Sequence, residues 1–189
     1  VLVGAGSDMP YLCGYTALPL ERINALLVPD SGEPALFVPA LEAPRVEPGE
    51  FALVAWNETD DVYGMVSERL SPGTRIAVGE TMWSGFLLEF QQRLVGAEWS
   101  VASRLTRELR MRKEPEEVDR LRRAAEAADR VLSRIPDEVR FSGRTEMQVA
   151  ADFSRMSIEE GHDRSWFTIV ASGPNSASPH HETGERIID

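Results

Sequence analysis

The sequence has little cysteine, lysine or histidine. Cys13 is its one cysteine, so no intramolecular disulfide can form, which fits a reducing compartment. Tyr11, Leu12 and Tyr15 surround Cys13 and indicate a small, buried side chain. A reactive thiol is not expected, because no basic neighbour would lower the pKa of Cys13.

Long apolar runs and an excess of positive charge are also missing. No apolar run approaches the roughly 20 residues that a membrane-spanning helix needs. The 189 residues include 31 acidic and 20 basic side chains, which gives a formal net charge of −11 at pH 7. That charge disfavours binding to nucleic-acid phosphates and to anionic membrane surfaces. We therefore expect neither nucleic acid nor a membrane among the partners.

Both ends of the sequence lack the features of a natural terminus. The first residues, 1–3, are a strand-like apolar run without an initiator methionine. The last residues, 187–189, read as the start of another element. We expect a protein that is truncated at both ends, which leaves the question of an N-terminal signal peptide open.

The first half of the chain alternates short apolar runs with turns and amphipathic stretches. Residues 23–28 and 35–38 are separated by a short Asp/Ser/Gly segment, which predicts a hairpin. Helices are expected over 60–70 and 81–94, with Thr81 as the N-cap of the second. A hairpin inside a βα pattern predicts a mixed α/β sheet. Further strands are expected at residues 1–4, 51–56, 75–79 and 98–102.

The composition changes near residues 110–115. Pro115, followed by two acidic residues, predicts the first turn of a long helix, which Pro136 should end or kink. We therefore place a domain boundary between residues 1–110 and residues 111–189. Small alanines in the apolar seam of this helix predict close packing against a sheet or another helix. The seam comprises Val118, Leu121, Ala125, Ala128, Leu132 and Ile135.

A second helix and a stiff turn follow. Thr145 and Gln148 have the spacing of a capping box, and Gly161 is a natural helix end. The aromatic and β-branched run 166–170 predicts a strand. Residues 172–176, Ser-Gly-Pro-Asn-Ser, then predict a stiff turn, because glycine and asparagine tolerate positive φ and proline fixes its own.

Two of the three histidines, His180 and His181, come shortly after that turn. Titratable side chains on a loop that a rigid strand anchors are often presented for chemistry, but a polar loop that merely faces water fits the residues equally well. The third histidine, His162, is expected in a solvent-exposed loop. The run from His180 to Glu182 lacks the spacing of metal ligands. Adjacent side chains on extended backbone point in opposite directions, so the two histidines are not expected to share one task.

The order of these parts resembles a known family. The stretches 113–118 (Lys-x-Pro-Glu-Glu-Val), 143–150 (Gly-x-Thr-Glu-x-x-Val-Ala) and 168–180, which ends in Pro-His, resemble the pita-bread metallopeptidases. That family includes Xaa-Pro aminopeptidases, prolidases and creatinase. Tyr-Leu-Cys-Gly-Tyr at residues 11–15 resembles an element of their N-terminal domain. The resemblance implies a mixed-sheet α/β creatinase-type N-terminal domain, followed by the first part of an α+β pita-bread catalytic domain.

In that family the catalytic unit holds two divalent metal ions, often manganese or cobalt, on Asp, His and Glu ligands. The resemblance places these ligands downstream of Asp189, so it implies no metal ligand in this chain and an inactive fragment. It implies that His180 is catalytic and donates a hydrogen bond or a proton to the substrate or to the leaving amine. His181 is a candidate for substrate binding.

The resemblance implies a metal-dependent exopeptidase that cleaves Xaa-Pro bonds in short peptides, as an Xaa-Pro aminopeptidase or a prolidase does. Many members of the family are dimers, so a cytoplasmic homodimer is expected of the whole protein. Two alternatives stay open, namely a creatinase-like C–N amidinohydrolase and a non-catalytic binding scaffold of the same fold. A downstream set of Asp, Asp, His, Glu and Glu would favour the peptidase.

Overall fold

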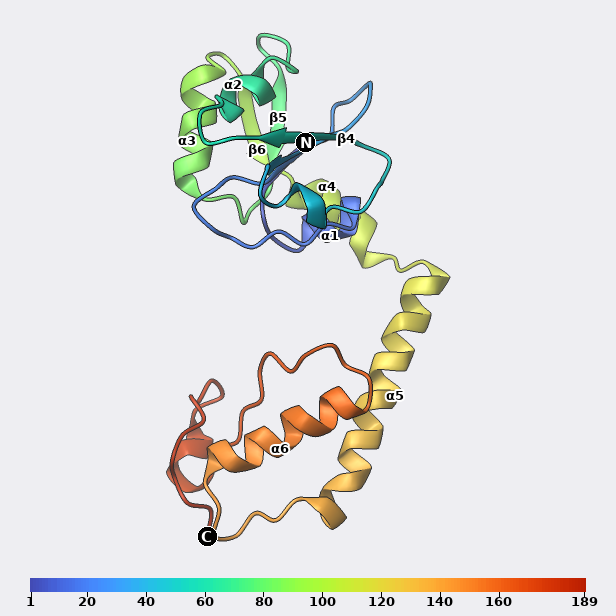
Figure 1. Cartoon of the computed structure of the whole chain (residues 1–189), viewed down its shortest axis with the longest axis vertical. Helices are drawn as coiled ribbons and strands as arrows, with labels where there is room; N and C mark the ends of the chain where they lie inside the picture. The colour runs from blue at the N-terminus through green and yellow to red at the C-terminus, as the bar shows by residue number, and fades with distance from the viewer. The chain divides into compact units, whose positions relative to one another are not determined.

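The computed structural model describes residues 1–189, which form two compact units, Val1–Arg112 and Lys113–Asp189 (Figure 1). Each unit has an apolar core of its own. None of the helices is long and apolar enough to cross a membrane.

A six-stranded sheet organises the first unit. Its strands are β1 (Leu2–Val3), β2 (Ala25–Leu27), β3 (Ala35–Pro39), β4 (Ala52–Trp56), β5 (Arg75–Val78) and β6 (Glu98–Val101), in the order β4-β3-β2-β1-β5-β6. β2 pairs antiparallel with β1 and with β3, whereas the β1/β5, β3/β4 and β5/β6 pairs are parallel. The predicted mixed α/β sheet is confirmed, and so is the hairpin between β2 and β3.

Apolar clusters cover both faces of this sheet. The helices of the unit are α1 (Asp8–Cys13), α2 (Val62–Ser67), α3 (Ser84–Arg93) and α4 (Ser103–Met111), with a 3-10 turn η1 (Ala43–Arg45). Leu2 and Leu27 belong to the cluster that α2 and α3 complete, whereas Val3 and Leu26 belong to the cluster that α1 completes. Burial of both faces explains why these strands are continuous apolar runs in the sequence.

The predicted N-cap at Thr81 is wrong. α3 begins at Ser84, and Trp83 occupies the N-cap position without a side-chain capping hydrogen bond. The chain first closes a turn in which the Met82 N–H donates to the Gly79 carbonyl at 3.1 Å. Because of this turn, the helix begins three residues after Thr81. The amino-acid sequence alone does not indicate the turn.

Two helices dominate the second unit, α5 (Pro115–Glu138) and α6 (Glu146–Glu159), with a 3-10 turn η2 (Gly173–Ala177). The predicted helix start at Pro115 is confirmed. The predicted capping box is confirmed as well, because Thr145 Oγ1 accepts from the Gln148 N–H at 3.2 Å and Gln148 Oε1 accepts from the Thr145 N–H at 3.0 Å. Pro136 lies in the last turn of α5, where it leaves two more helical residues after it.

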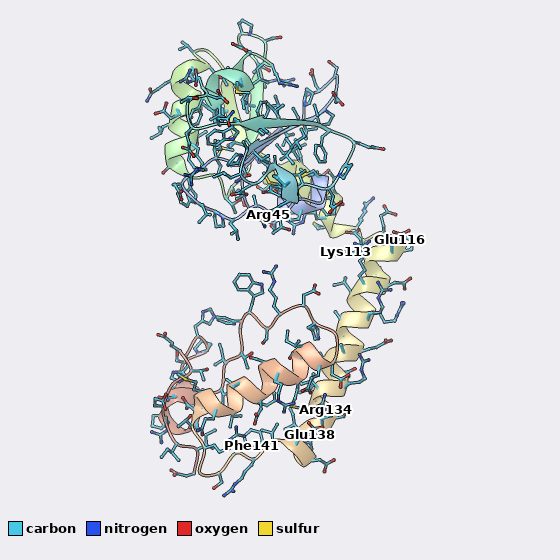
Figure 2. The ribbon with its side chains drawn as sticks, in the orientation of Figure 1. Arg45, Lys113, Glu116, Arg134, Glu138 and Phe141 are labelled. Carbon is cyan, nitrogen blue, oxygen red and sulfur yellow. The ribbon has the colours of Figure 1, made fainter.

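Ion pairs join the C-terminal ends of α5 and α6. Arg134 contacts Glu138 on its own helix at 2.8 Å, and Figure 2 shows these two side chains near one another. Arg134 also contacts Glu159 at 2.7 Å and Glu160 at 2.8 Å. These side chains are partly exposed, so solvent screens the pairs and each contributes little to stability.

The apolar core of the second unit lies against the C-terminal half of α5. The predicted seam on α5 is only partly observed: its member Ile135 packs against the core, but Leu121 and Leu132 are 58% and 61% exposed. Ala127 and Val131, which the seam left out, are buried. At these positions the packed residues precede the predicted ones, Ala128 and Leu132, by one residue. The direction of the packed stripe depends on where α6 lies, which the sequence of α5 does not encode. The core comprises Val131, Val139, Val149 and Met156, with Ile135, Phe153, Val170 and Ile188 packed around them.

The predicted strand at 166–170 is not observed, because no backbone ladder pairs this segment. Trp166 and Phe167 are 77% and 74% exposed. The guanidinium of Arg164 lies 4.8 Å from the centroid of the Trp166 ring instead. A β-favouring sequence forms a strand only where a second strand accepts and donates its backbone hydrogen bonds.

Candidate functional site

The histidine loop, residues 172–183, continues into a segment that is held on the first turn of α6. There the Glu146 N–H donates to the Arg186 carbonyl at 2.9 Å, and the Met147 N–H donates to the Gly184 carbonyl at 3.0 Å. These two carbonyls satisfy amide groups that the start of a helix otherwise leaves unpaired. The end of the loop is therefore fixed to the helix turn that carries Glu146.

Glu146 binds the other parts of the loop through a carboxylate that is fully buried. Its Oε1 accepts from the Ser172 N–H at 2.6 Å, from the Ser172 hydroxyl at 2.9 Å and from Asn175 Nδ2 at 3.1 Å. Its Oε2 accepts from Asn175 Nδ2 at 3.1 Å and contacts His181 Nε2 at 2.8 Å. One side chain on α6 thus ties together three residues of the histidine loop.

The hydrogen bonds determine the charge of this carboxylate. Burial by itself raises the pKa of Glu146, because a low-dielectric surrounding disfavours the ionised form. The hydrogen bonds from His181, Ser172 and Asn175 favour the ionised form and together lower the pKa to about 2. Glu146 is therefore an anion at neutral pH, and its oxygens can only accept hydrogen bonds.

The charge of Glu146 determines which nitrogen of His181 carries a proton. Because Oε2 can only accept, Nε2 is the donor in the 2.8 Å contact between the two side chains. The His181 side chain is 18% exposed, so the pair is largely shielded from water. Whenever this ring is neutral, Nδ1 is left as a hydrogen-bond acceptor.

His180 lies beside His181 in the sequence but has a different environment. Its side chain is exposed, and its ring packs edge-to-face on Phe167, with 6.3 Å between the ring centroids and an interplanar angle of 86°. The nitrogens of the His180 ring have no hydrogen-bond partner in the protein. The structure therefore ties His181 to a buried carboxylate and leaves the imidazole of His180 open to a ligand.

A side chain of the histidine loop holds the segment 166–170, which does not form the predicted strand. Thr183 Oγ1 accepts from the Val170 N–H at 3.0 Å and lies 3.3 Å from the Thr168 carbonyl, to which it can donate. Gly173 has a φ of 50°, and a Cβ at this position would lie 2.7 Å from Nη2 of Arg186. The positive φ explains the glycine, because side chains rarely adopt it, whereas the flexible end of Arg186 could move aside.

The side chains that could ligate a metal ion are not clustered in this chain. Residues 1–189 include no group of three or more His, Cys, Asp or Glu side chains that could hold one. In the run from His180 to Glu182, the central imidazole is bonded to Glu146 and its two neighbours are exposed.

A hollow elsewhere in the second unit involves the third histidine. It has a volume of about 580 Å³ and lies between α5 and residues 160–163, with Arg120, Arg123 and His162 among its lining residues. His162 is half-buried there, whereas the sequence predicted an exposed loop histidine. The histidine loop contributes no residue to this hollow.

Glu146 was missed in the sequence because an acidic residue in the first turn of a helix is usually solvated. A signal was available in the helical period. Glu146 precedes Val149 by three residues and Ala150 by four, and Phe153 follows on the same stripe. Its side chain therefore lies on the buried face of α6, and a buried carboxylate needs hydrogen-bond donors nearby.

Two family models match the chain. The model of the creatinase/prolidase N-terminal domain matches residues 1–112, and the model of metallopeptidase family M24 matches residues 119–189. Among curated proteins, the chain is 38% identical over 194 residues to the probable dipeptidase PepE of Mycobacterium tuberculosis. That alignment covers 100% of this chain and 51% of the relative, so the chain spans about half the length of the curated relatives it matches.

Solved structures show the same fold. The dipeptidase PepE from Mycobacterium ulcerans is 36% identical with a TM-score of 0.84, and the match covers 100% of this chain and 52% of that one. A recombinant prolidase from Thermococcus sibiricus is 30% identical with a TM-score of 0.90, and the match covers 100% of this chain and 53% of that one. These matches confirm the predicted fold class, an N-terminal domain followed by part of the catalytic domain.

Proposed function

The chain belongs to the creatinase/prolidase family of M24 metallopeptidases, and from this premise we propose that the whole protein is a metal-dependent exopeptidase of the Xaa-Pro type. Its substrates would be short peptides with proline after the scissile bond, cleaved as by an Xaa-Pro aminopeptidase or a prolidase. The observation that carries the proposal is the open imidazole of His180 on a fixed loop, within the part of the chain that matches family M24.

His180 is proposed as the catalytic residue of this chain. Its ring nitrogens are free to donate a hydrogen bond to the oxygen of the reacting carbonyl, or a proton to the leaving amine. A histidine is suited to both tasks because its ordinary pKa lies near 6.5. The contact with Phe167 and the fixed loop limit the directions in which the ring can point.

His181 is proposed to bind substrate. Its Nε2 is already bonded to Glu146, so Nδ1 is the atom left for a substrate donor. An N–H group of a peptide, or its protonated amino terminus, supplies such a donor.

Metal ions of the proposed enzyme would be held by residues outside this chain. Family M24 consists of metallopeptidases, and we propose two divalent ions, manganese or cobalt, on ligands downstream of Asp189. None of the residues described here is assigned to them, because no suitable cluster exists in residues 1–189.

The remaining proposals concern the whole protein. We propose that residues 1–110 form a creatinase-type N-terminal domain and residues 111–189 the first part of a pita-bread catalytic domain. A cytoplasmic homodimer that binds neither nucleic acid nor membranes is proposed as the working form. Its mass in dilute solution tests the dimer directly.

The proposed function is tested with the full-length protein. With Mn²⁺ present, we expect cleavage of an Xaa-Pro dipeptide or of a longer peptide with proline in the second position. Cleavage of neither would overturn the proposal, and hydrolysis of creatine instead would identify the amidinohydrolase.

His180→Ala tests the catalytic role. We expect turnover to fall about 10²- to 10⁴-fold, the contribution of a positioned acid or base, while the metal content stays unchanged. His162→Ala is the matched control, because this histidine lies outside the loop, and it should leave turnover nearly unaltered. Lost metal binding in His180→Ala would show that the role assigned to this side chain is wrong.

A further inference from the structure

Glu146 is an unusual residue to bury. It has no exposed surface, and the side chains that bind it are Ser172, Asn175 and His181. No arginine or lysine pairs with its carboxylate among the contacts of the site. A buried charge is costly unless it is hydrogen-bonded, and an apolar or amide side chain could fill the same space without that cost.

A carboxylate does one thing in this position that an amide cannot do. Both of its oxygens are acceptors, and both face donors: Oε1 faces Ser172 and Asn175, and Oε2 faces Asn175 and His181. The same group therefore holds the turn at residues 172–175 and imposes a donor at Nε2 of His181. The turn and the imidazole of His181 are held by the same carboxylate, and His180 lies between them in the sequence.

We propose that Glu146 is a positioning residue of the active site, which fixes His181 as its Nε2–H tautomer and thereby presents Nδ1 as an acceptor to an N–H donor of the substrate. The effect on substrate binding rests on the proposed peptidase function, whereas the contacts between Glu146 and His181 do not depend on it. In the same arrangement Glu146 fixes the backbone that carries His180. Glu146 itself touches no reacting atom.

The variant Glu146→Gln separates this role from a merely structural one. Its amide has one oxygen and one NH₂ group. If the oxygen stays with the Ser172 N–H and hydroxyl, the NH₂ group faces His181, where a second donor cannot be tolerated. His181 relieves the conflict by moving its proton to Nδ1, so that Nε2 becomes the acceptor. If Glu146 only filled space beside the loop, the substitution would leave the tautomer of His181 unchanged.

The tautomer is measured from the ¹⁵N chemical shifts of the imidazole nitrogens, in the 189-residue chain, at a pH where the rings are neutral. Only three histidines contribute, and His162→Ala and His180→Ala assign their signals. We expect the Nε2–H form for His181 in the wild type and the Nδ1–H form in Glu146→Gln. Glu159→Gln is the matched control, because it removes a carboxylate from the far end of α6 and should leave the tautomer as in the wild type.

The wild-type measurement keeps the inference falsifiable even if Glu146→Gln does not fold. An Nδ1–H tautomer of His181 in the wild type would overturn it, and so would an unchanged Nε2–H tautomer in a folded Glu146→Gln chain. Ser172→Ala removes one donor from Oε1 but leaves the contact with His181, so it should retain the wild-type tautomer.

Kinetics of the full-length enzyme give the second readout. We expect Glu146→Gln to lower kcat/KM about 10- to 100-fold, as is typical when the partner that orients a functional imidazole is lost. Glu146→Asp keeps an acceptor-only group and should recover part of that loss, whereas equal losses in the two variants would contradict the inference. A full-length protein without peptidase activity would overturn the proposed function, and the tautomer experiment would still decide the role of Glu146.

Discussion

At the scale of single residues, the contact between Glu146 and His181 shows how a helix can control a loop far along the chain. The two residues are 35 positions apart, yet their side chains meet at 2.8 Å inside the second unit. The carboxylate is kept ionised by donors that lie on the loop itself. Protonation of Glu146 would therefore weaken every contact that it makes with the loop.

The stability of the second unit should consequently depend on pH through Glu146. The pKa of this group is about 2 in the folded chain, below its ordinary value of 4.5. Its contribution to the free energy of unfolding is therefore complete above pH 4.5 and is lost as the pH falls toward 2. We expect the difference in unfolding free energy between the wild type and Glu146→Gln to shrink over this range.

Urea unfolding followed by circular dichroism at 222 nm, between pH 7 and pH 2, measures that difference. Glu138, Glu159 and Glu160 also have lowered pKa values because of their contacts with arginines, so the absolute stability of both proteins will fall with them. Comparison of the two proteins removes this shared effect. A difference that stays constant down to pH 2 would contradict the assignment.

Individual residues of the site were only partly predictable from the sequence. The loop and its two histidines were found because Gly, Pro and Asn in a short stretch define a turn, and the imidazoles that follow it are conspicuous. Glu146 was not found, because the capping pattern around Thr145 and Gln148 describes the backbone of the first turn and not the direction of the side chain between them. Whether a first-turn acid is buried depends on what packs on the helix.

At the scale of elements, α5 shows two adjacent stripes with opposite environments. Val131 is 6% exposed and belongs to the core, whereas its neighbour Leu132 is 61% exposed. The pattern of large apolar residues favoured the second stripe. Packing against α6 selects the first, which includes the smaller Ala127.

A pair of substitutions tests this reading of α5. Val131→Ala should destabilise the second unit by about 2 kcal/mol, because it removes buried methyl groups and leaves a cavity. Leu132→Ala deletes a larger side chain but should change stability by less than about 0.5 kcal/mol, because that side chain is in water. Hydrogen exchange of the amides in α5 and α6 measures both effects. A larger loss of stability for Leu132→Ala than for Val131→Ala would instead support the seam predicted from the sequence.

Elements specified by short-range interactions were predictable, and those specified by distant partners were not. The hairpin of β2 and β3 and the capping box of α6 each depend on residues within a few positions of one another. The segment 166–170 has the composition of a strand but no strand to pair with among residues 1–189. The start of α3 was displaced from Thr81 by a backbone turn, which composition does not reveal.

At the scale of the whole molecule, the chain combines a matched N-terminal domain with a part of a metallopeptidase domain that lacks a metal cluster. Its formal charge of −11 is the excess of 31 acidic over 20 basic side chains, and the acidic ones are spread over the sequence. Dispersed surface carboxylates attract divalent ions only weakly, and salt screens that attraction. A true metal site needs several ligands directed at one point.

We therefore expect the 189-residue chain to show only weak, salt-sensitive binding of Mn²⁺ by titration calorimetry, whereas the full-length protein should bind it at saturable sites. The chain alone should also cleave no Xaa-Pro peptide. Saturable binding of Mn²⁺ to the chain in 0.15 M salt would place ligands within residues 1–189 and contradict the proposed division of the active site.

The positions of the tryptophans have a practical consequence for any optical study of this chain. Trp56, in the first unit, is 7% exposed and donates a hydrogen bond to the Ile23 carbonyl at 3.2 Å. Trp166, the one tryptophan after residue 112, is 77% exposed. Unfolding moves the indole of Trp56 from an apolar surrounding into water but barely changes the surrounding of Trp166. Thermal unfolding followed by tryptophan fluorescence therefore reports the loss of the β-sheet unit. It is nearly insensitive to unfolding of the unit that carries the histidines.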